Sequence, residues 1–144
     1  MKKRLYLDNC SFNRPYDDQS ILKNHLEAQA KIYIQNEILQ ANYELAWSYI
    51  LDYEIFFNPF LDRKNQIVKW KNIAKINITE SEKIIVMANR IMKKNIKPKD
   101  SLHLACAIEA ECNYFITTDG KILNKTVDNI IVIDPITFLR LIEV

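Results

Sequence analysis

The chain has 144 residues, of which 49% are hydrophobic and 26% are charged, with a formal net charge of +2. These proportions are typical of a globular protein and exclude a disordered or fibrous chain. The length favours a single domain over residues 1–144. The small net charge does not by itself indicate a nucleic-acid-binding protein. Gly120 is the only glycine, which excludes Walker-type and dinucleotide-binding loops, because each needs several glycines close to phosphate.

The start of the chain is basic, but it lacks the apolar stretch of a signal peptide because Asp8 interrupts the run. No segment approaches the length and hydrophobicity of a membrane span. Three cysteines, Cys10, Cys106 and Cys112, form no C-x-x-C pair. We therefore expect reduced thiols, a cytoplasmic protein and no association with a membrane.

Hydrophobic periodicity and turn signals predict strands that alternate with helices. The predicted strands are residues 4–8, 43–47, 113–117 and 130–133. The predicted helices are residues 18–39, 49–57, 62–73, a helix through 84–92, 98–111, a short helix after 119, and a last helix capped by Asp134 and Pro135. The segments between them include a predicted loop at 13–20 and a short extended link at 75–79.

Three of these helices carry further signals. Thr79 and Glu82 have the spacing of a capping box before the helix through 84–92. The helix 98–111 is apolar on all sides in its middle, so we expect it to be buried. The helix 18–39 has an apolar stripe that we expect to face the core, with its histidine in a structural role. That stripe consists of Ile21, Leu22, His25, Leu26, Ile32 and Tyr33.

Continuous apolar strands that alternate with helices predict an α/β fold with a mostly parallel sheet covered on both faces. In such folds ligands bind outside the carboxyl ends of the strands. Asp8 and Asp119 stand at the carboxyl ends of two predicted strands. The functional site is therefore expected at this edge of the sheet.

More carboxylates are expected to join this pair. Asp100 lies in the first turn of the buried helix, where the helix dipole favours an anion. A fourth acid is either Asp52 or Glu54; two residues apart on a helix is a rotation of about 200°, so only one of them can face the cluster. Carboxylates gathered in this way repel one another unless a cation neutralises them.

The donor set indicates the ion and the chemistry. Carboxylate oxygens without a supporting set of histidines and cysteines favour Mg²⁺ or Mn²⁺ over zinc. An ion held in this way suits hydrolysis of a phosphodiester. Lysines close to Asp100 would help an anionic substrate to approach. They are Lys93, Lys94, Lys97 and Lys99.

Two stretches carry a resemblance to a known family. "LYLDNCSFNRPYDD" at 5–18 and "KDSLHLACAIEAECNYFITTDGKIL" at 99–123, with the acidic helix between them, resemble a PIN domain. The resemblance covers essentially the whole chain and is strongest to the short stand-alone bacterial PIN proteins, many of them VapC-type toxins. It implies a three-layer α/β/α sandwich and a metal-dependent endoribonuclease that acts on RNA. As a toxin, it would form a homodimer and have an antitoxin protein as a partner.

The resemblance also assigns residues. It matches Asp8, Glu54, Asp100 and Asp119 to the family's catalytic, metal-binding acids, and it is the reason to prefer Glu54 to Asp52. Two further matches are Thr117, at a hydroxyl position that orients a carboxylate or phosphate, and Asn9, which would fix substrate or water. Lys97 and Lys99 complete the expected contacts with the substrate.

The match departs from the family in one place, and other interpretations stay open. Gly120 and Lys121 stand where the family often has a further acid, so a second metal position is not implied. The chain could then be a PIN-like module that binds RNA or a protein without cleaving. A phosphohydrolase with Asp8 as nucleophile would need an acid at position 10, where the chain has Cys10.

His103, three residues after Asp100, is either a packed, hydrogen-bonded histidine or a residue that touches the site.

Overall fold

The computed structural model describes residues 2–142 and contains a five-stranded sheet in the order β3-β2-β1-β4-β5. All neighbouring strands in this described part run parallel. The strands are β1 (Arg4–Leu7), β2 (Glu44–Ser48), β3 (Ile76–Ile78), β4 (Tyr114–Ile116) and β5 (Ile131–Ile133). The parallel sheet predicted from the sequence is thus confirmed.

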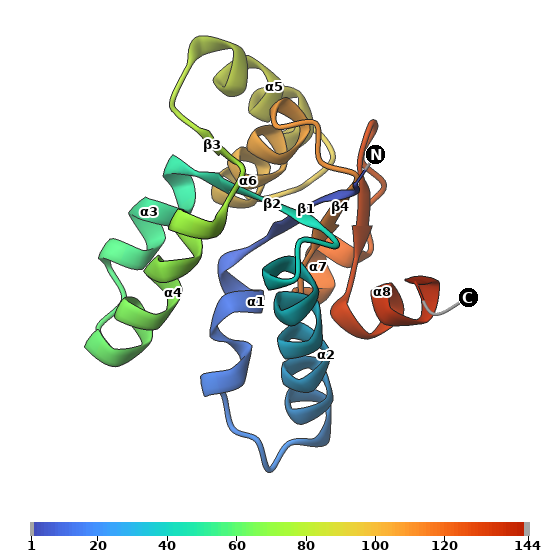
Figure 1. Cartoon of the computed structure of the whole chain (residues 1–144). Coiled ribbons are helices and arrows are strands. Elements are labelled where there is room, and N and C mark those ends of the chain that lie inside the picture. The colour runs from blue at the N-terminus through green and yellow to red at the C-terminus, as the bar shows by residue number, and fades with distance from the viewer. Residues whose placement is uncertain (1, 143–144) are drawn as a thin grey trace.

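Helices lie on both faces of the sheet (Figure 1). The helices α5 and α6 pack together on one face, and α2 and α8 pack together on the other. The helices are α1 (Asn9–Asn13), the 3₁₀ turn η1 (Arg14–Tyr16), α2 (Leu22–Leu39), α3 (Tyr49–Phe56), α4 (Leu61–Ile73), α5 (Glu82–Met92), α6 (Pro98–Glu109), α7 (Gly120–Leu123) and α8 (Pro135–Ile142). The three-layer α/β/α architecture is confirmed.

The order of the strands determines where a site can form. From β1 the chain proceeds outward through β2 and β3, and it then returns to the other side of β1 with β4 and β5. The boundary between β1 and β4 is therefore the point at which the strand order reverses, and ligands bind at such points in open α/β sheets. Leu7 pairs with Ile116, so Asp8 and Thr117 follow side by side at this boundary.

Large apolar side chains hold the two central strands in place. Tyr6 stacks on Phe115 with ring centroids 5.3 Å apart, and both residues are fully buried. Phe12 and Trp47 are fully buried as well and pack at 5.5 Å. Each such side chain contributes about 1.5–3 kcal/mol of hydrophobic stabilisation. The carboxyl ends of β1 and β4 are thus rigidly fixed relative to each other.

The loop predicted at 13–20 is partly wrong, because helix α1 starts directly after β1 and η1 continues it. The side chain of Asp8 caps α1 by accepting a hydrogen bond from the Ser11 backbone N–H at 2.9 Å. Pro15 lies in the first turn of η1, where its fixed φ fits a helix start. Residues 9–16 therefore form two short helical turns that contact α2, and α1 also contacts α3.

Two other local predictions need correction. The extended link at 75–79 is the edge strand β3, which pairs with β2 through the Ala46–Ile76 register. The predicted capping box of Thr79 and Glu82 is wrong, because the side chain of Ser81 caps α5 by accepting from the Ile84 N–H at 3.3 Å. Asp134 does cap α8 as predicted, accepting from the Thr137 N–H at 2.9 Å.

The apolar stripe expected on the core side of α2 is wrong as well. Its members, His25 included, are exposed, and the opposite face of the helix is buried. That buried face carries polar residues among small and apolar ones, which hides it from a search for apolar periodicity. It consists of Glu27, Ala28, Ala30, Lys31, Ile34, Gln35 and Ile38. Within residues 2–142, no helix is long and apolar enough to cross a membrane.

Lys31 offers a direct test of this packing. Burial lowers the pKa of its amine from 10.5 to about 7, so its charged form is disfavoured in the folded state. We expect Lys31→Met to raise the free energy of unfolding at pH 7 by at least about 2 kcal/mol. The gain should shrink as the pH rises toward 10, because the unfolded chain then also loses the proton. Urea unfolding at both pH values measures this, and a less stable variant at pH 7 would contradict the burial of the amine.

Candidate active site at the carboxyl ends of β1 and β4

Asp8 is the most buried carboxylate at this edge, with 4% of its surface exposed. One oxygen accepts a hydrogen bond from the Ser11 N–H, and the other accepts from the hydroxyl of Thr117. Burial raises the pKa of Asp8 from 3.8 to about 6, and these two hydrogen bonds limit the rise. Asp8 is therefore a desolvated acid in a fixed orientation.

The segment after β4 completes this arrangement. The Thr117 hydroxyl, which donates to Asp8, also accepts a hydrogen bond from the backbone N–H of Asp119 at 3.0 Å. Asp119 caps α7 by accepting from the Lys121 N–H through Oδ1. Thr117 was predicted to orient a carboxylate or phosphate, and its hydrogen bond to Asp8 is a contact that this role requires. The role itself stays a prediction.

The side chain of Glu54, on α3, faces this edge, whereas that of Asp52 points away from it. One oxygen of Glu54 contacts His103 Nε2, and the other accepts from the Asn9 amide at 3.2 Å. Asp52 accepts from the Trp47 indole at 2.9 Å and from Lys71 at 3.1 Å. The two acids occupy opposite sides of α3, and the structure brings only Glu54 to Asn9 and His103.

A buried hydrogen-bonded chain stands behind Glu54. His103 Nδ1 contacts the hydroxyl of Tyr6, which also hydrogen-bonds to Ser48 Oγ at 2.6 Å. Burial raises the pKa of Tyr6 well above its ordinary value, so this hydroxyl keeps its proton. His103 is thus hydrogen-bonded inside the core and in contact with the site, so both descriptions weighed from the sequence hold.

The pKa values of Cys10 and Asp100 show which acids act electrostatically on this edge. Partial desolvation raises the pKa of the Cys10 thiol to about 12, although the residue as a whole is exposed, and the negative charges of all four acids add to this increase: Asp8, Asp119, Glu54 and Asp100. The pKa of Asp100 is raised too, first by burial and then by Asp119. The topology therefore gathers carboxylates from β1, α3, α6 and the end of β4 within electrostatic reach of a single thiol.

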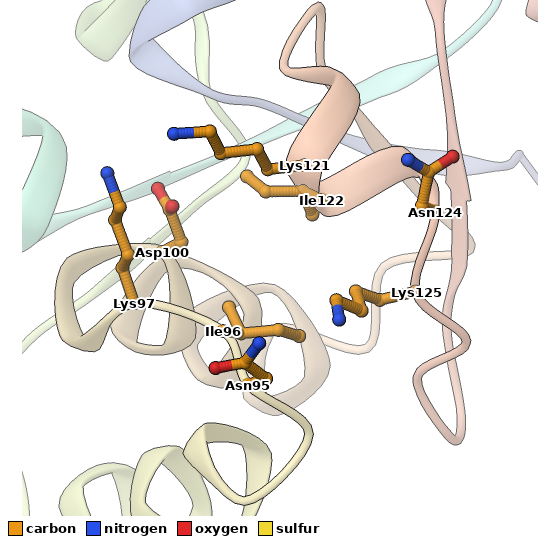
Figure 2. A pocket seen from close by; sticks show the side chains of 8 residues that line it. All are labelled: Asn95, Ile96, Lys97, Asp100, Lys121, Ile122, Asn124 and Lys125. Atoms are coloured by element: carbon orange, nitrogen blue, oxygen red, sulfur yellow. The ribbon is translucent and has the colours of Figure 1, made fainter.

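A pocket of about 360 Å³ adjoins this cluster at Asp100. Figure 2 shows Lys97 and Asp100 next to each other at the start of α6, with Lys121 extending toward them from α7. The lining residues are Asn95, Ile96, Lys97, Asp100, Lys121, Ile122, Asn124 and Lys125. Of the two lysines predicted to contact the substrate, only Lys97 lines this pocket; the Lys99 ammonium lies 5.7 Å from the centroid of the Tyr53 ring.

The donor chemistry of the four acids fits a hard cation such as Mg²⁺ or Mn²⁺, because all the donors are carboxylate oxygens. Within residues 2–142, however, no three His, Cys, Asp or Glu side chains lie close enough together to form a ready metal site. Glu54 is engaged by His103, whereas the Asp100 carboxylate accepts no hydrogen bond from the described residues. Asp8, Glu54, Asp100 and Asp119 are the residues that would hold an ion here.

Sequence reasoning missed three residues of this site. Tyr6 alternates inward on β1 like any core residue, so nothing marks its hydroxyl as a partner of His103. Ser48 ends β2, and its adjacency to Tyr6 depends on the pairing of β1 with β2. The sequence marks Lys121 as a departure from the family, and its position two residues after an expected site acid is the signal that could have found it.

Comparisons with known proteins bear on the fold. No protein-family model matches the sequence, and no curated protein matches it. Among solved structures, the chain is similar to a chain in the crystal structure of VapBC2 from Rickettsia felis bound to a DNA fragment from their promoter. The TM-score is 0.53 at 18% identity, over 90% of this chain and 96% of that chain. At this identity the likeness shows a shared α/β fold.

The raised pKa of Asp8 predicts a specific pH dependence of stability. A buried carboxylate whose pKa rises from 3.8 to about 6 binds its proton more tightly in the folded state, so stability falls as the pH rises through this window. In a metal-chelating buffer, we expect Asp8→Asn to be about 2 to 3 kcal/mol more stable than the natural protein at pH 8, and nearly equal at pH 3.5. Urea unfolding followed by tryptophan fluorescence measures both, and a destabilised variant at pH 8 would contradict the account.

Proposed function

We propose that the protein is a Mg²⁺- or Mn²⁺-dependent endoribonuclease, the toxin of a bacterial type II toxin–antitoxin pair. The observation that carries the proposal is that four acids lie around the strand-order reversal, all within electrostatic reach of Cys10, beside a pocket with three lysines in its lining. Such a set of acids is destabilising in the absence of a cation, and an anionic polymer needs nearby positive charge to approach it. A metal-dependent nuclease requires both features side by side.

Each group in the site would have a distinct task. When bound, the ion would supply Lewis-acid stabilisation of the phosphate and a water of lowered pKa. Asp8 is held by Thr117 and Ser11, and Glu54 by Asn9 and His103, so these two acids are pre-oriented. Their fixed orientation would reduce the reorganisation that the reaction requires.

The lysines would bind the RNA on either side of the scissile bond. Lys97 and Lys121 line the pocket next to Asp100, where they would contact backbone phosphates. Lys99 lies beside the exposed ring of Tyr53, so an unpaired nucleotide there would meet a charge and an aromatic face together. This surface suits single-stranded RNA, whose bases are free to stack.

We further propose a homodimer and an antitoxin protein as partners. The end of α3 and the start of α4 expose several large apolar side chains in a short stretch of sequence. They are Tyr53, Phe56, Phe57, Phe60 and Leu61. Large apolar side chains exposed close together are typical of a protein–protein interface, and the likeness to a chain of the VapBC2 structure supports an antitoxin as the partner.

A PIN-like module that binds RNA without cleaving it is the second candidate. It is favoured by Lys121, which stands where the family often has a further acid, and by the engagement of Glu54 with His103. Such a module would keep the lysine-lined pocket for RNA but would not need to bind a divalent cation.

Cleavage of single-stranded RNA in the presence of Mg²⁺ or Mn²⁺ distinguishes the two candidates. We expect Asp8→Asn to reduce cleavage by more than about 100-fold, because even residues that only support metal ligands contribute roughly 10–100-fold. Asp52→Asn is the matched control, since Asp52 is on the same α3 as Glu54 but pairs with Trp47 and Lys71. It should keep full activity.

Both variants are purified identically and checked for native circular dichroism, so that contaminating nuclease and misfolding are visible. Equal cleavage by Asp8→Asn and the natural protein would exclude this site as the source of activity. RNA binding without any cleavage, with or without the cations, would instead favour the non-cleaving module.

A further inference from the structure

A second pocket, of about 310 Å³, has α2 and α4 in its walls, and α1 lies between these two helices (Figure 1). Its walls are mostly aromatic and apolar. Phe12 and Ile67 are buried, Trp70 is half-buried, and the ring of Tyr16 is exposed. The volume is at the lower end of the range for small-molecule sites, which is about 300–1,000 Å³.

Two polar side chains of this pocket are almost completely buried. Lys31 and Gln35 are only 5% and 7% exposed, and both line the pocket. The amide nitrogen of Gln35 is buried and makes no hydrogen bond within residues 2–142. The Lys31 ammonium lies 5.5 Å from the centroid of the Phe12 ring, and burial alone accounts for the lowered pKa of this amine. No carboxylate of the described chain stabilises its charge.

The two donors are placed to act together. Residues four apart on a helix lie on the same face, so Lys31 and Gln35 present an N⁺–H and an amide N–H on successive turns of α2. Buried polar groups are nearly always hydrogen-bonded, and unpaired ones that persist are expected mainly at functional sites. A partner for these donors must therefore be an acceptor, and a negative charge on it would stabilise the ammonium in this desolvated place.

The pocket also limits what kind of anion fits. One cation and one amide match the two oxygens and single charge of a carboxylate, whereas a phosphate would leave most of its charge and acceptors unpaired. The aromatic walls favour a flat apolar body, since stacked and edge-on ring contacts add to hydrophobic burial. A lone carboxylate without such a body would leave these walls unfilled.

We propose that this pocket binds a small aromatic carboxylic acid, with its carboxylate on Lys31 and Gln35 and its ring packed against Phe12, Tyr16 and Trp70. This site is separate from the acidic cluster, and it does not depend on ribonuclease activity.

Phenylacetate is a suitable probe, with phenylacetamide as the uncharged control of the same shape. In ¹H–¹⁵N spectra of the full-length protein at pH 6, where Lys31 is protonated, phenylacetate should shift the amide resonances of Lys31 and Gln35 saturably. We expect phenylacetamide to bind at least tenfold more weakly. Lys31→Met should weaken phenylacetate binding at least tenfold, while Lys23→Met, at an exposed lysine of the same helix, should leave it unchanged.

The stability measurement for Lys31→Met described above establishes independently that this variant folds. Three results would overturn the proposal. Phenylacetate could fail to shift these resonances at any concentration up to the millimolar range. It could bind equally well to Lys31→Met. Phenylacetamide could also bind as tightly as phenylacetate, which would identify the pocket as a purely apolar docking surface for a protein side chain.

Discussion

The burial of one carboxylate at the end of a core strand is the constraint on which the rest of this structure depends. Asp8 follows the buried strand β1 directly, and 4% of its surface is exposed. Its charge is tolerated because the Ser11 N–H and the Thr117 hydroxyl each donate to one of its oxygens. The first of these bonds also caps α1, so the same side chain starts a helix and organises the site.

The remaining acids reach this point because of the parallel topology. β1 is the strand at which the order reverses, so the segment after β4 lies beside it and supplies Thr117 and Asp119. Helix α6 packs against α3 and β2, and it places His103 where it contacts both Tyr6 and Glu54. The core thus fixes the positions of acidic groups despite their mutual repulsion.

The sequence predicted the features that follow from the order of strands and helices along the chain and from continuous apolar runs. The strand ends at Asp8 and Asp119 predicted where a site would lie, because apolar runs followed by a carboxylate are uncommon and parallel strands share an edge. The resemblance favoured Glu54 over Asp52, and the structure places Glu54 at this edge because Trp47 and Lys71 hold Asp52 elsewhere. No periodicity could have supplied that distinction, since it depends on contacts between elements.

Other features were beyond pattern reasoning for physical reasons. Helix α1 has five residues and is capped by the side chain of Asp8, so it carries no periodic signal. The exposed face of α2 is the more apolar one, because its buried face contains Glu27, which pairs with Arg14, together with Lys31 and Gln35, whose amide nitrogen has no partner within residues 2–142. Hydrophobicity alone therefore selects the wrong side of this helix, and the same mixed polarity makes its buried face a candidate binding site.

Binding of Mn²⁺ to the metal-free protein tests the central claim most directly, since the claim is that the acids at this edge hold a divalent ion. Titration followed by the electron paramagnetic resonance of free Mn²⁺ should show binding to the natural protein and to Asp52→Asn. Asp8→Asn and Glu54→Gln should each bind at least about tenfold more weakly. Absence of Mn²⁺ binding by the natural protein, or equal binding by all four proteins, would contradict the account.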